Sequence, residues 1–210
     1  MMICDTLSSI EIGTKGQTTL ITEAEILEKT SYPNPLWLPY TARHTFEDGH
    51  TEQLTSHLRP DGVFAVRYGN NKSRLFFLEA EHYSPVFRKT LGDKATKNKK
   101  TGKYSHGGNS STLRKLLAYK NTRDEKVTWN QLRKHGFTVL FVFPKELYRD
   151  NAVRLAEKLF GQTDLFLFQT VPVQQEILGA PKPFPGLYTG LWRRAGLPDV
   201  SISEPPSDER

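Results

Sequence analysis

The sequence predicts an α/β domain: a small mixed central sheet of about five strands, flanked by helices. The main observation is an apolar run at Phe137–Phe143, closed by Pro144, which is typical of a strand covered on both faces. A strand-turn-strand pattern over residues 53–81 precedes this run, and segments with apolar residues at helical spacing flank it. A strand that is apolar on both faces needs a layer on each side, so helices are expected on both faces of the sheet.

Composition limits the classes to which the protein can belong. The chain has 210 residues, enough for one domain with its own core. A single cysteine, Cys4, excludes an intramolecular disulfide and a multi-cysteine zinc site, and predicts a reducing, cytoplasmic location. No apolar run approaches the length of a membrane helix, so no membrane association is expected. The net charge of +6 favours a polyanionic partner.

The first half of the chain shows one helix start and one hairpin. Thr22 and Glu25 have the spacing of a capping box, and the prolines at 33 and 35 end the short helix that follows. Residues 31–50 are expected to be irregular. Two extended runs over 53–67 meet near Pro60, and turn formers over 68–73 join the second run to a strand at 75–81. This second pair predicts a β-hairpin.

The second half alternates helices and strands. Leu113, Leu116 and Leu117 predict a helix over 112–124, and Asp150 is expected to cap another that ends at Gly161. A short strand over 165–168 follows, and the proline-rich remainder is expected to be extended or disordered, with Leu191, Trp192 and Leu197 docking on the core. The expected organisation is an N-terminal extension packed on the core (1–52), a core domain (53–170) with a mobile basic loop (88–111), and a C-terminal tail (171–210).

Within the basic loop, cations gather with almost no large apolar residue and a single acid, Asp93. A segment of this composition cannot bury itself. Its basic residues are candidates for contacts with nucleic-acid phosphates, the alternative being a loop kept basic for solubility. They are Arg88, Lys89, Lys94, Lys97, Lys99, Lys100 and Lys103, and Lys120 outside the loop is a further candidate for the same contacts.

Three acidic residues are the candidates for chemistry. Because side chains alternate along a strand, Glu79 and Glu81 point to one face at the end of an otherwise buried strand. Asp61 starts the partner strand, so the hairpin is expected to bring it beside Glu79. Oxygen ligands without a cysteine or histidine cluster favour Mg²⁺.

Each acid also has a structural interpretation. Asp61 could cap the Pro-Asp-Gly turn, and Glu79 could pair with a basic residue of the 112–124 helix. Glu81, expected to be the most exposed of the three, could be a solvated strand end. Lys115 on that helix could simply face solvent.

These motifs together resemble a known family. Arg59–Gly62, Phe77–Glu81, Leu113–Tyr119 and the Phe137–Phe143 strand are similar to the replication-relaxation family, whose fold is like PD-(D/E)XK restriction-endonuclease domains. The resemblance covers about Ser56 to Thr170 and implies an αβββαβ core that acts on or binds DNA. The family is encoded largely by plasmids and other mobile elements.

Carried over to this chain, the resemblance assigns Asp61 to the Pro-Asp motif and Glu79 to the first acid of the (D/E)XK motif, and both to a Mg²⁺ site. Glu81 occupies the lysine position, so Lys115 or Lys120 would supply the displaced catalytic lysine. The N-terminal winged helix that many members carry is not recognisable here.

The resulting expectation is a DNA-binding, nuclease-like protein of a plasmid or mobile element with a Mg²⁺-dependent site. The alternative is a non-catalytic accessory factor of plasmid replication or transfer that binds DNA or partner proteins. A module that binds only protein is a third reading, which the basic loop disfavours.

Overall fold

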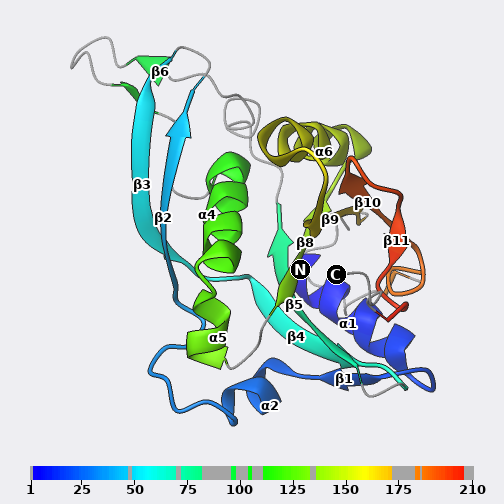
Figure 1. Ribbon diagram of the computed structural model, residues 1–210. Coiled ribbons are helices and arrows are strands. Elements are labelled where there is room, and N and C mark those ends of the chain that lie inside the picture. Colours follow the sequence, from blue (N-terminus) through cyan, green and yellow to red (C-terminus); the bar gives the residue numbers. More distant parts are fainter. Residues whose placement is uncertain are drawn as a thin grey trace.

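The computed structural model describes residues 2–46, 49–69, 72–81, 111–132, 136–171, 183–184 and 186–205, and the backbone of 96–97 and 104–105. Its centre is a mixed sheet with the strand order β1-β4-β5-β8-β9-β10-β11 (Figure 1). The strands are β1 (Thr19–Ile21), β4 (Gly62–Arg67), β5 (Ser73–Ala80), β8 (Phe137–Phe143), β9 (Thr163–Thr170), β10 (Leu191–Ala195) and β11 (Val200–Ser201). The mixed α/β class is confirmed, but this sheet has seven strands and not about five.

The additional strands lie at the two edges of the sheet. β1 pairs antiparallel with β4, while β10 pairs antiparallel with β9 and then with β11. β1 and β11 have three and two residues, too few for an alternating pattern to show in the sequence. In the middle of the sheet, β4 and β5 are antiparallel, and β5, β8 and β9 are parallel.

Helices cover both faces of the sheet, as expected (Figure 1). They are α1 (Met2–Thr14), α2 (Glu23–Leu27), α4 (Thr112–Asp124), α5 (Val127–Leu132) and α6 (Glu146–Phe160). The helices α2, α4 and α6 contribute to one apolar core, and α1 with the C-terminal segment encloses the other. The predicted capping box of α2 and the predicted bounds of α4 are confirmed.

The predicted start of α6 was wrong. The helix begins at Glu146, with Lys145 at the N-cap, and Asp150 lies within it, paired with Arg149. Its predicted end is confirmed, since Gly161 takes a positive φ of 65° just after the last helical residue. An aspartate is a good cap residue, but Glu146 and Leu147 are good helix formers and extend the helix toward Pro144.

Strand β5 shows the expected two-sided burial. Leu75 and Phe77 point into the core beneath α4, while Phe76, Leu78 and Ala80 point into the core beneath α1. Glu79 therefore follows Leu75 and Phe77 onto the α4 side of the sheet.

Residues 38–58 form a second, separate sheet, where irregular structure had been expected over 31–50. β2 (Leu38–Thr45) and β3 (Thr51–Leu58) pair antiparallel along their whole length and lie against α4 (Figure 1). Leu38, Tyr40 and Leu54 pack inward toward the helix. Pro39 within the alternating pattern obscured β2, and proline is tolerated in a two-stranded sheet because each strand has an open edge. A short pair, β6 (Thr96–Lys97) and β7 (Tyr104–Ser105), is described only as backbone.

The two ends of the chain meet on the α1 side. Trp192 is fully buried, as expected, whereas Leu191 is largely exposed. The backbone N–H of Phe184 donates to Ser9 Oγ at 2.7 Å, and a Cβ added at Gly13 would lie 2.4 Å from Tyr188 Cβ. The helix α1 and the C-terminal segment thus approach so closely that only glycine fits at position 13.

This close approach can be tested with Gly13→Ala. The added methyl should lower the free energy of unfolding by about 1–3 kcal/mol through overpacking, although alanine is the better helix former. Gly136→Ala is the control, because among the described residues no atom beyond its chain neighbours lies within 4 Å of the added Cβ. Chemical denaturation measures both, and a Gly13→Ala variant as stable as wild type would contradict the packing of Tyr188 on α1.

Candidate functional site

Asp61 and Glu79 meet across the β4–β5 hairpin. The backbone N–H of Asp61 donates to Leu78 O at 3.0 Å, and the N–H of Ala80 donates to Asp61 Oδ2 at 2.9 Å. The hairpin thus fixes the Asp61 carboxylate on the backbone of the residue that follows Glu79. Asp61 itself is exposed, whereas Glu79 is only 1% exposed.

Two side chains of α4 bind the Glu79 carboxylate. Lys115 Nζ lies 2.5 Å from Glu79 Oε2, and the Tyr119 hydroxyl donates to Glu79 Oε1. Lys115 and Tyr119 are four residues apart, so they lie on the same face of the helix. The interpretation of Glu79 as the partner of a basic helix residue is confirmed as a contact, and Lys115 is not the solvent-facing lysine that was the alternative.

Glu81 was expected to be the most exposed of the three acids, and this was wrong. Glu81 is 8% exposed, and its backbone N–H donates to Val142 O at 2.9 Å. Its Oε1 lies 3.0 Å from Lys115 Nζ. The backbone bond to the end of β8 keeps Glu81 in line with the sheet beyond β5, so its carboxylate is held near the same lysine as Glu79.

Burial and charge shift the proton affinities of this cluster. Burial raises the pKa of Glu79 to about 7, and the nearby Asp61 carboxylate adds to the effect against the opposing influence of Lys115 and Tyr119. Burial alone would lower the pKa of Lys115, but Glu79 and Glu81 outweigh it and the pKa lies above its ordinary value. Burial, with Glu79 beside it, also raises the pKa of the Tyr119 phenol. Lys115 and Tyr119 therefore both remain hydrogen-bond donors at neutral pH.

The donor set suits a hard cation only in part. Within the described ranges, no group of three or more carboxylate, imidazole or thiol side chains is placed to hold a metal. Asp61 and Glu79 nevertheless supply carboxylate oxygens, and Mg²⁺ commonly takes one or two carboxylates and keeps several waters. Each carboxylate oxygen has two acceptor positions, so a hydrogen bond from Lys115 or Tyr119 leaves one free. Asp61 and Glu79 thus carry the kind of oxygen that such an ion takes, while Lys115 pairs with both Glu79 and Glu81.

The other predicted site residues lie elsewhere or cannot be placed. Lys120 is paired with Asp124 at 2.6 Å on the exposed side of α4, away from the contacts of Lys115. Among the candidate basic residues of the loop, only Lys97 is described, as backbone in β6. The remaining candidates, Arg88, Lys89, Lys94, Lys99, Lys100 and Lys103, lie outside the described residues.

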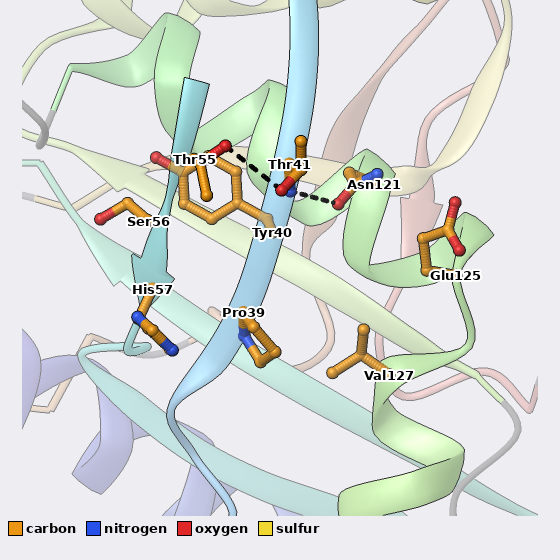
Figure 2. A pocket seen from close by; sticks show the side chains of 9 residues that line it. All are labelled: Pro39, Tyr40, Thr41, Thr55, Ser56, His57, Asn121, Glu125 and Val127. Atoms are coloured by element: carbon orange, nitrogen blue, oxygen red, sulfur yellow. Dashed lines mark hydrogen bonds between the residues drawn. The ribbon is translucent and has the colours of Figure 1, made fainter. Parts of the chain in front are cut away.

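Tyr119 was missed by sequence reasoning. Its position four residues after Lys115, on a helix whose bounds were predicted, was the available signal. A hollow between the β2–β3 sheet and α4, drawn in Figure 2, contains none of Asp61, Glu79 or Lys115.

No family model, curated protein or solved structure matches the chain. The resemblance to the replication-relaxation family therefore rests on the motifs of the sequence alone. No helix in the described part of the chain has the length and apolar character needed to cross a membrane.

The role of Lys115 in the fold can be tested with Lys115→Met. Removing the ammonium leaves two buried carboxylates without their cation, which should lower the free energy of unfolding by about 3–5 kcal/mol at pH 8. The loss should shrink as the pH falls toward 5, because protonation of Glu79, whose pKa is raised by burial, removes its unpaired charge. The sign follows from linkage: with a carboxyl pKa above its unfolded value, the folded state binds more protons, so stability falls as the pH rises through that pKa.

Lys120→Met is the matched control for that experiment. Its ion pair with Asp124 is exposed, so the change should cost less than about 1 kcal/mol and depend little on pH over the same range. Urea denaturation at several pH values distinguishes the two variants. Equal, pH-independent losses would show that Lys115 does not neutralise the buried acids.

Proposed function

We propose that this protein is a Mg²⁺-dependent DNA endonuclease of the PD-(D/E)XK type, encoded by a plasmid or another mobile element. The observation that carries the proposal is the meeting of Asp61, Glu79 and Lys115. Asp61 lies just before β4, Glu79 lies near the end of β5, and Lys115 lies on α4, in the connection between β5 and β8.

The topology supports the same proposal. In chain order, α1, β1, β4, β5, α4 and β8 follow the αβββαβ pattern. The additional elements are α2 and the β2–β3 sheet after the first strand, the β6–β7 pair before α4, and α5 after it. The strands β1, β4 and β5 form the antiparallel part, and α4 joins β5 to the parallel strand β8. The two acids then stand at the end of the central hairpin, where a phosphodiester could approach the exposed Asp61.

The chain's own residues would divide the work. The backbone N–H of Ala80 orients the Asp61 carboxylate, Tyr119 orients that of Glu79, and these two carboxylates would hold the ion. Mg²⁺ bound there would polarise the scissile phosphate and activate a water. Lys115 remains protonated and can donate to the negative charge that develops on the phosphate oxygens.

One observation favours the non-catalytic alternative. Both oxygens of Glu79 already have partners, and Lys115 also lies beside Glu81, so the cluster joins β5 to α4 without a metal. In that case the protein would be an accessory DNA-binding factor, and its cations would act through counterion release.

Conservative variants test the proposed activity. Asp61→Asn keeps an acceptor for the Ala80 N–H, and Glu79→Gln keeps the shape of the side chain. Each should reduce Mg²⁺-dependent cleavage of supercoiled plasmid by at least about 100-fold, with little change in fold by circular dichroism. Asp124→Asn, an exposed acid on α4, is the control and should cut like wild type.

Wild-type protein that cuts no DNA with either Mg²⁺ or Mn²⁺ would overturn the nuclease proposal. The alternative would then require DNA binding that survives chelation, weakens steeply with salt, and falls when Lys97, Lys99, Lys100 and Lys103 are changed to glutamine. Fluorescence anisotropy with a labelled duplex measures this.

A further inference from the structure

The outer face of the β2–β3 sheet is a continuous exposed surface that the proposed cleavage site does not use. In the antiparallel register, four cross-strand pairs share this face, and all eight side chains are exposed. The pairs are Pro39–His57, Thr41–Thr55, Arg43–Gln53 and Thr45–Thr51. We call this surface the ribbon face.

The chemistry of the ribbon face is polar, with a cation and no acid. Arg43 and Gln53 stand opposite each other at its centre. The hydroxyls of Thr45 and Thr51 lie 2.8 Å apart and those of Thr41 and Thr55 lie 3.3 Å apart, which lines up donors and acceptors along the sheet. Figure 2 shows Thr41 at the edge of β2 between Thr55 and Asn121.

The single acid within the two strands is turned away from this face. Glu52 alternates to the inner side, where its Oε1 lies 3.3 Å from Arg114 Nη2. Glu47 and Asp48, in the turn between the strands, lie outside the described residues. Glu125, just after α4, lines the hollow of Figure 2 together with Thr41 and Thr55. The half of the face around Arg43 and Gln53 lies outside that hollow, and it is this half that suits an anionic partner presenting hydrogen-bonding groups.

The shape of the sheet suits the same partner. Two eight-residue strands at about 3.4 Å per residue give a ribbon about 27 Å long. The major groove of B-form DNA, about 12 Å wide, admits a two-stranded ribbon. Arginine donates to guanine O6 and N7, glutamine pairs with adenine N6 and N7, and the threonine methyl contacts the thymine methyl. A peptide strand is a poorer candidate, because the Thr41 N–H at the β2 edge already donates to Asn121 Oδ1 at 2.9 Å.

Helix α4 connects the β2–β3 sheet to the candidate active site. Arg114, which pairs with Glu52 of β3, precedes Lys115, which pairs with Glu79. Asn121 of the same helix binds the backbone of β2. One rigid helix thus fixes the ribbon relative to the acids.

From these observations we infer that the ribbon face reads duplex DNA sequence in the major groove, with Arg43 and Gln53 as the principal base contacts. This inference rests on the proposed DNA-directed function and deepens it: cleavage would occur at a set distance from a recognised sequence.

The experiment begins with selection of bound duplexes from a random-sequence library by the full-length protein, with divalent metal chelated so that nothing is cut. Dissociation constants for the selected duplex and a scrambled duplex are then measured by fluorescence anisotropy at one salt concentration. Wild type should prefer the selected duplex by roughly 10-fold or more. The Arg43→Ala/Gln53→Ala variant should bind both duplexes alike, within about 3-fold of the wild-type affinity for the scrambled one.

A matched control removes the same two functional groups elsewhere. Arg154→Ala/Gln17→Ala deletes an exposed arginine on α6 and an exposed glutamine after α1 and should keep the preference. Methylation of guanine N7 by dimethyl sulfate gives a second readout, since N7 lies in the major groove. Wild type and the control should protect guanines in the selected duplex, and Arg43→Ala should lose that protection.

Several outcomes would overturn the inference, and they separate it from the proposed function. Mg²⁺-dependent cleavage by a wild type without sequence preference would leave the nuclease standing and remove the reading role of the ribbon. The reading role would also be removed if the Arg43→Ala/Gln53→Ala variant kept the wild-type preference for the selected duplex, or if the protein bound only single-stranded DNA. A wild type that neither binds nor cuts DNA would remove both.

Discussion

The fold around the candidate site depends on neutralising one buried carboxylate. β5 is apolar on both faces up to Glu79, its next-to-last residue, which is 1% exposed, so the charge of this carboxylate must be neutralised inside the protein. Lys115 and Tyr119 of α4 bind the Glu79 carboxylate, and the Lys115 ammonium also pairs with Glu81. The position of α4 over the sheet is thereby set by charge as well as by apolar packing. The same contacts leave Asp61, at the solvent side of the cluster, as the carboxylate accessible to a ligand.

Sequence reasoning succeeded where a single local pattern decided the outcome. The all-apolar strand β8, the leucine spacing of α4 and the alternation along β5 each follow from burial acting on neighbouring residues. The meeting of Asp61 with the end of β5 followed from the hairpin that joins them. β5 has eight residues, α4 has 13 residues and β8 is buried along its whole length. Each element is therefore long enough or apolar enough for its pattern to be recognised in the sequence.

Sequence reasoning failed where the structure of a segment depends on residues that are distant in the sequence. β2 contains Pro39, and its inward residues are buried only because α4, some 70 residues later, covers them. α1 is rich in polar residues, and Thr6 and Ser9 turn their hydroxyls back to the carbonyls of Met2 and Asp5, so no apolar stripe marks it. The burial of Glu81 likewise depends on Lys115 and on the end of β8, neither of which its own neighbours reveal.

The helix α4 has two sets of contacts that interleave along one segment. Arg114 and Asn121 bind the β2–β3 sheet, while Lys115 and Tyr119 bind the acid at the end of β5. Each residue added to an α-helix turns everything after it by about 100°. A one-residue insertion or deletion between Lys115 and Tyr119 would therefore turn Tyr119 and Asn121 away from their partners while Arg114 and Lys115 kept theirs, so both sets of contacts would be broken. Over evolutionary time, this segment should tolerate exchange of side chains far better than any change in its length.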